Sequence, residues 1–549
     1  MPVATVKNSL RQLRSDVRKA RSTLSLVFSL PAFLREPINL QTVEFDVKAE
    51  LENREERFLH LIYTGVYQST ASPYLKLLKL AGCEYGDLQS HVWRHGLEKT
   101  LQQLASEGVY LTSDEFKGKK DIVRGKDQFR AAPEAFERRD AGAGFVAQSS
   151  GTRNRPIRSS IALDWLRIRS LGIGLFLKSH NVCSHAHAVY EPILPVSTGI
   201  NNILYNARLR IPTERWFAAR VPANNPMEAW YNSSVTSLVV RTAKLLGHNF
   251  PNPEIGDQGH IEEILRWIED KRTEGKDCCI KTTASNAAKI ANQASKTGVS
   301  LERTKFISGG EPFTEAKQEV IKRAGASAIT RYNYGGGVTV GLGCANPIHT
   351  DEVHVNQYML AVISQPKALI LQDRVVRPLL CTTLYSSAPR LLLNVDNGDY
   401  ADLLNRDCGC RLQRAGLTLH LHHIRSYEKF TSEGMNYFYG DLFDFIEGTL
   451  PSEFGGGPGD YQLIEEEDSG GQSRLTLVIH PRVGDLDERR VLVRLRNAFS
   501  KGSRDNRFMT GIWESAGTFR IKRAIPHSSN RGKVLPLHIS MVNNRSGRG

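Results

Sequence analysis

Residues 148–156 combine small, hydroxyl-bearing and cationic side chains in one short run, QSSGTRNRP, which follows a brief apolar stretch. Small residues allow a backbone to approach a polyphosphate closely, hydroxyl and backbone N–H groups can donate to its oxygens, and a cation offsets its charge. The run therefore predicts a phosphate-binding loop, although turns rich in Ser and Gly also occur without a ligand. The candidate contacts are Ser149, Ser150, Gly151, Thr152 and Arg155.

A second group of residues has the side chains that hold zinc. Cys408 and Cys410 form a Cys-x-Cys pair, Cys344 lies upstream, and His349 and His354 follow Cys344. Bringing two loops together would make a Cys₃His site of the kind that binds structural Zn²⁺. Buried free cysteines are the alternative. The histidines of HNVCSHAH, residues 180–187, are weaker support for a metal because they are only local neighbours.

The run at residues 148–156 resembles the phosphate loop of the acyl-adenylate-forming superfamily, and in particular of its phenylacetate-CoA ligase-like branch. The family form is SSGT followed by TGKP; here Pro156 matches and Arg155 replaces the lysine. Further segments match in the same order: ISGGEP at 307–312, YNYGGG at 332–337, NGD at 397–399 and IRSYEKFTSEGMN at 424–436. The resemblance implies that Asp399 accepts hydrogen bonds from the ribose hydroxyls. The other implied nucleotide contacts are Gly309, Gly310, Glu311, Tyr334, Gly335 and Arg425.

The segment PHSSNRGK at 526–533 is similar to the superfamily's C-terminal loop, which makes Lys533 the catalytic residue that closes over the substrate carboxylate and α-phosphate. A fixed ammonium there stabilises charge on a pentacovalent phosphorus more than in the ground state. Some members of the branch hold a structural zinc with cysteines and a histidine at matching places. Because EVHVNQYML resembles the family's LHIWEDHFL, the resemblance favours His354 over His349. The implied ligands are Cys344, His354, Cys408 and Cys410.

Two positions depart from the family pattern. The glutamate that helps hold Mg²⁺ has no counterpart, since Gly337 and Val338 stand at the corresponding positions. The hinge before the lid carries Tyr427, with Glu428 beside it, instead of an aspartate. Mg²⁺ can be held through phosphates and water, because it often uses few protein ligands. The alternative is a nucleotide-binding relative in which adenylation is altered or lost.

The elements that must position these residues fall into two α/β units. Apolar residues recur at three- and four-residue spacing at 51–65, 74–80 and 88–105, so residues 1–140 are predicted to be a helical part of the large domain. From 141 to 425, apolar runs alternate with helical patterns at 277–282, 285–297, 304–308 and 314–324, which predicts a layered nucleotide- and acid-binding part. The predicted fold class is α/β: a large layered N-terminal adenylate-forming domain and a small α+β C-terminal lid domain.

The lid is predicted at residues 426–549, where the pattern restarts with strands at 461–466, 474–480 and 518–523 and a helix at 486–500. The resemblance implies that this domain is mobile. The run FGGGPGDY at 454–461 lacks the Lys-Ser/Thr ending of a phosphate loop and is predicted to be a flexible connection.

Composition limits the class of function. A chain of 549 residues needs more than one core. Its net charge of +14 admits nucleic acid, an acidic membrane surface or a polyanionic small substrate as partners. Without a zinc-finger, RNP-type or basic-heptad pattern, nucleic-acid binding is only the third hypothesis.

Eight cysteines without regular spacing favour a reducing cytoplasm. The apolar stretch at 22–34 is predicted to be a helix face, and no run is long enough to cross a membrane.

The sequence therefore predicts an enzyme that uses ATP and Mg²⁺ to activate a small-molecule carboxylic acid as acyl-AMP, with release of pyrophosphate. The acyl group would then pass to a thiol or an amine, with CoA as the family's default acceptor. A carrier-protein thiol or an amine acceptor, the identity of the acid and a homodimer all stay open. By approximate family position, Tyr205 and Trp230 are candidates for the acid pocket.

Overall fold

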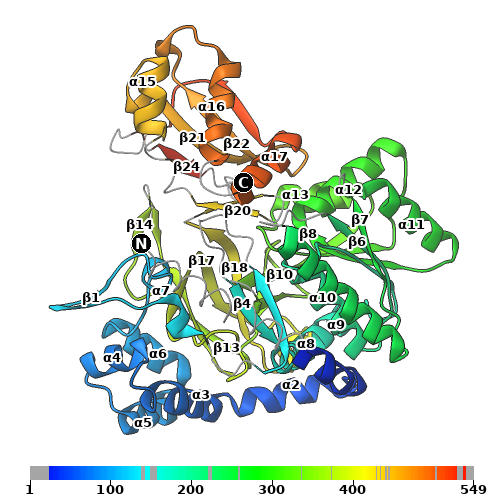
Figure 1. Cartoon of the computed structure of the whole chain (residues 1–549), viewed down its shortest axis with the longest axis vertical. Coiled ribbons are helices and arrows are strands. Elements are labelled where there is room, and N and C mark those ends of the chain that lie inside the picture. The colour runs from blue at the N-terminus through cyan, green and yellow to red at the C-terminus, as the bar shows by residue number, and fades with distance from the viewer. Residues whose placement is uncertain are drawn as a thin grey trace.

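The computed structural model describes residues 24–137, 142–148, 158–219, 226–256, 260–334, 337–371, 374–427, 429–432, 435–438, 442, 445–500, 504–527, 534 and 536–539. A twelve-stranded sheet runs through the larger part of the molecule, and a separate four-stranded sheet with its own helices lies at one end (Figure 1). The fold class is thus α/β, with a large layered part and a small α+β part, as predicted.

The N-terminal part is helical because its apolar side chains recur on one face of each helix and pack into a common core. Residues 24–35 are helical, which confirms the helix predicted for the apolar stretch there. The pattern predicted at 51–65 divides at Asn53, which ends one helix and precedes the next. The elements are α2 (Val43–Glu52), α3 (Arg54–Ile62), the π-helical turn η1 (Tyr63–Tyr67), α4 (Pro73–Leu80), α5 (Tyr85–His95), α6 (Leu97–Ser106) and α7 (Ser113–Phe116).

One half of the large sheet is parallel. Its strands, in spatial order, are β10 (Ser327–Tyr334), β9 (Thr304–Gly309), β8 (Cys278–Thr283), β5 (Ala186–Tyr190), β6 (Thr213–Ala219) and β7 (Pro253–Gly256). The helices on its two faces are α8 (Leu163–Ser179), α9 (Thr198–Arg208), α10 (Pro226–Leu245), α11 (Ile261–Thr273), α12 (Ala284–Thr297) and α13 (Glu315–Arg323). Neighbouring residues therefore face different cores: Phe306 packs with α11–α13, and Ile307 belongs to the core that contains α8 and α9.

The other half of the sheet is antiparallel and continues from β10. Its strands, in spatial order, are β11 (Val338–Gly343), β12 (Val353–Val355), β18 (Leu419–Ser426), β17 (Val395–Asn405), β16 (Pro378–Thr383) and β13 (Leu360–Ser364). The short helix α14 (Arg411–Arg414) lies between β17 and β18. Among the hairpins outside this sheet are β1 (Ile122–Arg124) with β2 (Asp127–Phe129), β3 (Gly144–Gln148) with β4 (Arg158–Ala162), and β14 (Leu369–Leu371) with β15 (Arg374–Val376).

The C-terminal sheet has a core of its own, formed by residues such as Leu463, Leu477, Leu495 and Trp513. Its spatial order is β23 (Phe519–Arg523), β22 (Ser473–Ile479), β21 (Tyr461–Glu467) and β24 (Leu537–Ile539). Its helices are α15 (Leu450–Phe454), α16 (Glu488–Ser500) and α17 (Arg504–Ser515), and the hairpin of β19 (Lys429–Ser432) and β20 (Met435–Phe438) precedes them.

The glycine-rich run between α15 and β21, which was predicted to be a flexible connection, forms a turn closed by Asp460. The Gly457 N–H donates to Asp460 Oδ2 over 2.9 Å, and Arg482 pairs with the same carboxylate. Because Asp460 is buried, the run is fixed by its own carboxylate.

The small sheet rests on helices α12 and α13 of the large one. Lys317 Nζ on α13 lies 3.3 Å from Glu467 Oε1 on β21, and both side chains are almost fully buried. Asn292 Nδ2 on α12 donates to the Gly470 carbonyl oxygen over 3.0 Å. These contacts tie the two sheets together in this arrangement. Among the described helices, none has the length and apolar character needed to cross a membrane.

Candidate functional site

The turn after β9 carries three of the predicted nucleotide contacts. Gly310 has φ +82°, a conformation that favours glycine. Gly309 lies against β10 so closely that a Cβ would stand 3.2 Å from the Arg331 carbonyl oxygen and 3.3 Å from Asn333 Nδ2. The two glycines therefore let the chain leave β9 in a tight turn beside the next strand.

Glu311 holds this turn against the N-terminus of α12. Its carboxylate accepts hydrogen bonds from the Ser285 backbone N–H at 2.6 Å and from the Ser285 hydroxyl at 2.7 Å. A carboxylate at a helix N-terminus is stabilised by the unpaired N–H groups and the helix dipole. Since its side chain is engaged in this way, Glu311 orients the turn, and the backbone of the turn is what remains for a ligand.

Asp399 on β17 is held by β10. The Tyr332 hydroxyl donates to Asp399 Oδ2 over 2.7 Å, and Asn397 Nδ2 donates to the same hydroxyl over 2.6 Å. The Asp399 backbone N–H donates to Asn397 Oδ1 at 3.0 Å. Burial and the neighbouring Asp399 raise the pKa of Tyr332 well above its usual value, so the hydroxyl keeps its proton and stays a donor. The carboxylate is thereby fixed in position and orientation.

Arg425 and Tyr334 are the remaining predicted nucleotide contacts among the described residues. Arg425 lies on β18 opposite Tyr400, the residue after Asp399, and its guanidinium NH1 donates to Asp351 Oδ2 over 2.9 Å. Tyr334 ends β10 and is partly buried, and this burial raises its pKa well above the usual value. The β9–β10 register pairs Gly309 with Arg331, next to Tyr332. The structure thus connects Gly309, Asp399 and Arg425 through neighbouring residues.

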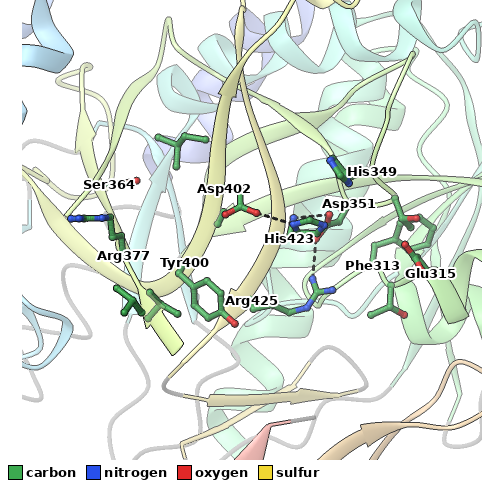
Figure 2. Close-up of a pocket in the computed structure, with 16 residues that line it drawn as sticks. Phe313, Glu315, His349, Asp351, Ser364, Arg377, Tyr400, Asp402, His423 and Arg425 are labelled. Atoms are coloured by element: carbon green, nitrogen blue, oxygen red, sulfur yellow. Dashed lines mark hydrogen bonds and ion pairs between the residues drawn. The ribbon is translucent and has the colours of Figure 1, made fainter. Parts of the chain in front are cut away.

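A pocket of about 800 Å³ opens beside Arg425. In Figure 2 its wall runs from Phe313 and Glu315, at the start of α13, past Arg425 and Tyr400 to Arg377. The pocket therefore reaches from the segment after the Gly309–Glu311 turn to the antiparallel half of the sheet.

Several predicted residues lie outside the described part of the chain. The phosphate-loop residues fall between β3 and β4, Gly335 follows β10, and Lys533 falls between β23 and β24. They are Ser149, Ser150, Gly151, Thr152, Arg155, Gly335 and Lys533. Glu428, beside the hinge, is also outside. Tyr427, at the predicted hinge position, is described, and its hydroxyl donates a hydrogen bond to Asp396 Oδ2.

Gly337 and Val338, which stand where the family has its magnesium-binding glutamate, offer no side-chain ligand. Val338 begins β11 and is buried, and the carbonyl oxygen of Gly337 accepts a hydrogen bond from Trp165 Nε1 at 2.8 Å. Of the two acid-pocket candidates, Tyr205 on α9 is buried, whereas Trp230 on α10 is 70% exposed. Trp230 therefore does not line an interior pocket.

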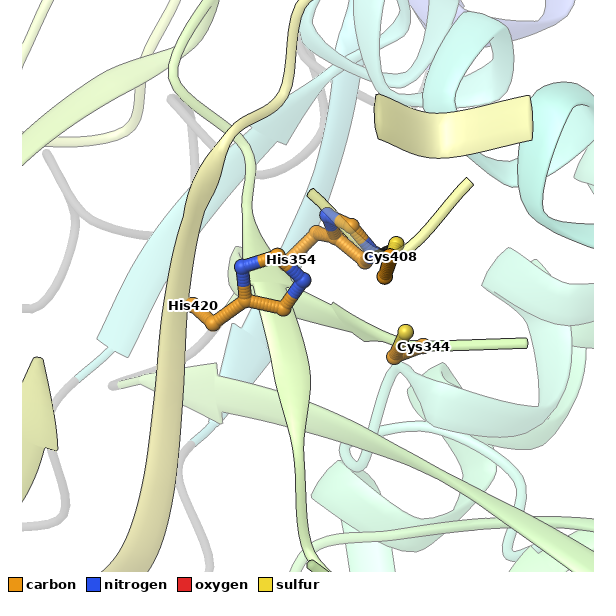
Figure 3. Close-up of side chains that lie close together, drawn as sticks. All are labelled: Cys344, His354, Cys408 and His420. Atoms are coloured by element: carbon orange, nitrogen blue, oxygen red, sulfur yellow. Dashed lines mark hydrogen bonds between the residues drawn. The ribbon is translucent and has the colours of Figure 1, made fainter. Parts of the chain in front are cut away.

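Three of the predicted zinc ligands, Cys344, His354 and Cys408, lie together at the end of β11, on β12 and after β17 (Figure 3), and the fourth, Cys410, adjoins His354. His354 Nε2 lies 3.2 Å from Cys410 Sγ and 3.5 Å from Cys408 Sγ. His354 Nδ1 lies 2.6 Å from the Leu417 carbonyl oxygen, so it carries the proton and Nε2 is left to bind a metal. A hydrogen bond from the Cys344 thiol lowers the pKa of Cys410, which favours the thiolate that metal binding requires.

His420 joins this group and was missed in the sequence. The β12–β18 register pairs it with His354, and the two rings lie 4.0 Å apart. The ligand atoms of Cys344, His354, Cys408 and His420 all lie within 4.8 Å of one another. These four side chains match the number of ligands of a tetrahedral zinc, and Cys410 lies beside them, in contact with His354. His349 is not among them, because its ring stacks on His422 instead.

The histidines of residues 180–187 do not form a metal group among the described residues. His180 Nε2 lies 2.9 Å from the Gly343 carbonyl oxygen, and His187 Nε2 lies 2.7 Å from that of Val182. Burial lowers the pKa of His180 to about 4 and that of His187 to about 3. Both are neutral core histidines satisfied by backbone carbonyls.

Two buried guanidinium groups, Arg169 on α8 and Arg331 on β10, lie behind the strand ends. Arg169 NH2 donates to Thr339 Oγ1 over 2.9 Å, and Arg331 NH1 donates to Asn202 Oδ1 over 3.0 Å. Within the described residues, Nε and NH1 of Arg169 and Nε of Arg331 have no hydrogen-bond partner. Burial raises the pKa of the nearby Glu191 carboxyl to about 7, so it compensates this charge only in part. An excess of buried positive charge is thus located beside β10.

Comparison with known proteins gives structural likeness only. No family model matches the chain, and no curated protein matches it. Among solved structures, a 2-hydroxyisobutyryl-CoA ligase in complex with 2-HIB-AMP and CoA is 12% identical with a TM-score of 0.49, over 92% of this chain and 91% of that one. A malonyl-CoA ligase with methylmalonyl-CoA and AMP bound is 14% identical with a TM-score of 0.39, over 74% and 75%.

A third solved structure, an amide bond synthetase from Marinactinospora thermotolerans, is 11% identical with a TM-score of 0.37, over 88% of this chain and 92% of that one. All three are ligases or synthetases by name. Since the identities are low and the TM-scores lie below 0.5, the functional assignment depends on the residues of this chain.

Proposed function

We propose that this protein is an ATP-dependent acid ligase that forms an acyl adenylate. The observation that supports this most is the hydrogen bond from the Tyr332 hydroxyl to Asp399. It joins two segments that are far apart in the sequence and that both resemble nucleotide motifs. ATP would lie at the ends of β9, β10 and β17, with the adenine against the backbone of the Gly309–Glu311 turn and the ribose hydroxyls donating to Asp399.

The reaction follows from these positions. An oxygen of the substrate carboxylate attacks the α-phosphorus, the bond to the β-phosphate oxygen breaks, and pyrophosphate leaves. The loop from Ser149 to Thr152 and Arg155 would cradle the phosphates, and Lys533 would stabilise the charge that develops on the α-phosphate. Val338 offers no carboxylate to Mg²⁺, so the ion that offsets the polyphosphate charge would be held by the phosphates and water.

The finer assignment is the phenylacetate-CoA ligase-like branch, with CoA as the acceptor and residues 426–549 as the mobile lid. It is supported by the Cys/His group, because Cys344, His354 and Cys408 lie together with His420, Cys410 adjoins His354, and these side chains are of the types that bind structural zinc. Bound there, Zn²⁺ would connect the end of β11, strand β12 and the segment after β17. The ion would thus stabilise the antiparallel half of the sheet that presents Asp399 and Arg425.

The acid itself would carry a second anionic group. Among the residues that the structure describes, the guanidinium groups of Arg169 and Arg331 retain N–H donors without a partner, and leaving such donors unpaired in the interior is costly. A carboxylate or phosphate on the far end of the acid would satisfy them. Both residues adjoin the nucleotide motifs: Arg331 pairs with Gly309, and a Cβ on Gly337 would lie 3.7 Å from Arg169 NH1.

Pyrophosphate release measured with ATP, Mg²⁺ and a panel of acids tests the function. Lys533→Ala should lose most of the turnover and remain folded, whereas Lys522→Ala, at an exposed position on β23, should keep it. Dicarboxylic acids should react faster than monocarboxylic acids of equal chain length, and Arg169→Met should reduce that preference. ATP binding without pyrophosphate release for any acid would favour the alternative of a nucleotide-binding relative. The absence of both would overturn the proposal.

A further inference from the structure

Asp402 on β17 and His422 and His423 on β18 meet His349, which lies in the segment between β11 and β12, and this group is separate from the Cys/His group. Figure 2 shows His349, His423 and Asp402 on the wall of the pocket. The ring of His422 stacks on that of His349, with centroids 4.0 Å apart and an angle of 16° between the planes. Ligand nitrogens of the three histidines all lie within 4.8 Å of one another.

The donor atoms have the spacing of a tetrahedral metal site. His422 Nδ1 lies 3.2 Å from His423 Nδ1, His423 Nδ1 lies 2.8 Å from Asp402 Oδ2, and His422 Nδ1 lies 3.7 Å from Asp402 Oδ2. Zinc binds imidazole nitrogen at 2.0–2.1 Å, so neighbouring ligands of a tetrahedral zinc are about 3.3 Å apart. These three separations lie on both sides of that value. A ligand nitrogen of His349 lies within 4.8 Å of one on each of the two other histidines, so His349 can become the fourth ligand if its ring turns out of the stack.

The backbone of β18 is distorted in a way that makes this meeting possible. Tyr400 pairs with Arg425 and Asp402 pairs with His422, so β18 has one residue more than β17 between the two pairs. Neighbouring residues of a regular strand point to opposite faces, whereas a bulge can re-aim a side chain. His423 occupies this bulge with φ +52°, which costs a residue with a side chain about 1–2 kcal/mol. As a result, His422 and His423 both reach Asp402.

Asp351 holds the bulge in place. Its carboxylate accepts the backbone N–H groups of His423 at 2.9 Å and Ile424 at 2.8 Å, and it also pairs with Arg425. Asp351 is therefore engaged with the backbone, and Asp402 is the carboxylate available to a metal. Residues that orient metal ligands in this way are a regular part of metal sites.

The site is open to solvent, unlike the Cys/His group. The His423 side chain is 44% exposed and that of Asp402 is 65% exposed, and both line the pocket of about 800 Å³. Imidazole and carboxylate together suit Zn²⁺ and similar divalent transition metals. We propose that His349, His422, His423 and Asp402 bind a Zn²⁺ ion at the pocket wall, in addition to any metal held by the cysteines.

Zinc content at a fixed, buffered free Zn²⁺ concentration tests this proposal on the full chain, without ATP or acid. The variant His349→Ala/Asp402→Asn should contain one zinc per chain less than the wild type. The difference does not depend on occupancy of the cysteine site, because that site is unchanged. The matched control, His60→Ala/Asp127→Asn, makes the same changes at exposed positions and should keep the full content.

Asp402→Asn alone is a second variant that leaves the packing intact, because the side chain is largely exposed. It should weaken Zn²⁺ binding to the site of His349, His422, His423 and Asp402 at least about tenfold in a calorimetric titration. Equal zinc content in the double variant and the wild type would overturn the proposal, as would an unchanged affinity in Asp402→Asn. Either result would leave the ligase proposal standing, since pyrophosphate release is measured separately.

Discussion

The hydroxyl of Tyr332 lies 2.7 Å from Asp399 although three strands, β11, β12 and β18, stand between their strands in the sheet. In a flat sheet, four steps of about 4.8 Å would separate the two strands by roughly 19 Å. The contact therefore requires the sheet to curl strongly between its parallel and antiparallel halves. This curvature brings the two predicted nucleotide motifs together.

Removing the Tyr332 hydroxyl should weaken nucleotide binding without unfolding the protein. A hydrogen bond to a charged group contributes about 1.5–3 kcal/mol, which corresponds to roughly 10- to 100-fold in affinity. We expect Asp399→Ala to raise the KM for ATP by roughly 10- to 100-fold. Tyr332→Phe should raise it by only a few fold, because this variant keeps the carboxylate and loses only its orientation. Tyr63→Phe, at a 41% exposed position, is the control. An unchanged KM for ATP in Asp399→Ala would show that Asp399 does not contact the nucleotide.

Glu311→Gln should destabilise the turn that follows β9. The two carboxylate oxygens accept hydrogen bonds from Ser285 at the N-terminus of α12. The amide of glutamine keeps only one acceptor oxygen and has no negative charge. We expect the free energy of unfolding to fall by about 1 kcal/mol, measured by urea denaturation. Glu319→Gln on α13, whose exposed carboxylate pairs with Arg323, should change it by less than about 0.5 kcal/mol. Equal effects of the two substitutions would contradict a capping role for Glu311.

Lys317→Met should loosen the contact between the two sheets. The substitution leaves the buried Glu467 carboxylate without its cation, which typically costs about 3–5 kcal/mol. Separation of the small sheet relieves this cost, so small-angle scattering should show a larger radius of gyration. The double variant Lys317→Met/Glu467→Leu should return toward the wild-type value. Lys322→Met, exposed on the same helix, is the control; a radius that stays constant in every variant would show that the pair does not hold the sheets together.

The stability of the protein should depend on His187 at acidic pH. Burial lowers the pKa of this histidine from 6.5 to about 3, so the unfolded chain binds a proton that the folded chain does not. Stability is then lost as the pH falls from about 6.5 to about 3, at about 1.4 kcal/mol per pH unit from this residue. His187→Gln should flatten the pH profile of unfolding in that window, and the exposed His60→Gln should not. Parallel profiles for wild type and His187→Gln would contradict the prediction.

The Cys/His group should retain about one zinc per chain through purification, because four or five ligands surround the position. Elemental analysis should show this zinc, and replacing both Cys408 and Cys410 with Ser should abolish it. Cys83→Ser/Cys183→Ser, at two partly buried free cysteines outside the group, is the matched control. Zinc content unaffected by the loss of Cys408 and Cys410 would exclude them as ligands.

Local patterns sufficed for much of the fold. Strands β8 and β9 and helices α12 and α13 lie within one or two residues of their predicted bounds. Their apolar periodicity is uninterrupted, and Thr283 and Thr314 cap the two helices by accepting the backbone N–H groups of Asn286 and Lys317. Helix ends of this kind are visible in a sequence because a Ser or Thr side chain satisfies a free backbone donor.

Contacts between distant segments could not be predicted in the same way. His420 reaches the cysteines only because the β12–β18 register sets it opposite His354, and no local pattern specifies that register. The bulge at His423 and the ion pair of Lys317 with Glu467 likewise depend on how separate elements meet. For Ser149–Arg155 and Lys533, which lie outside the described residues, the roles stay predictions.

Strand β18 carries His420, His422, His423 and Arg425 within its eight residues. A zinc ion on these histidines and a nucleotide at Arg425 would therefore restrain the same short piece of backbone. Binding of either would change the affinity for the other, and thermodynamic reciprocity requires the same factor in both directions. Metal occupancy of the pocket wall would then depend on the nucleotide concentration, and the affinity for nucleotide would depend on free Zn²⁺ by the same factor.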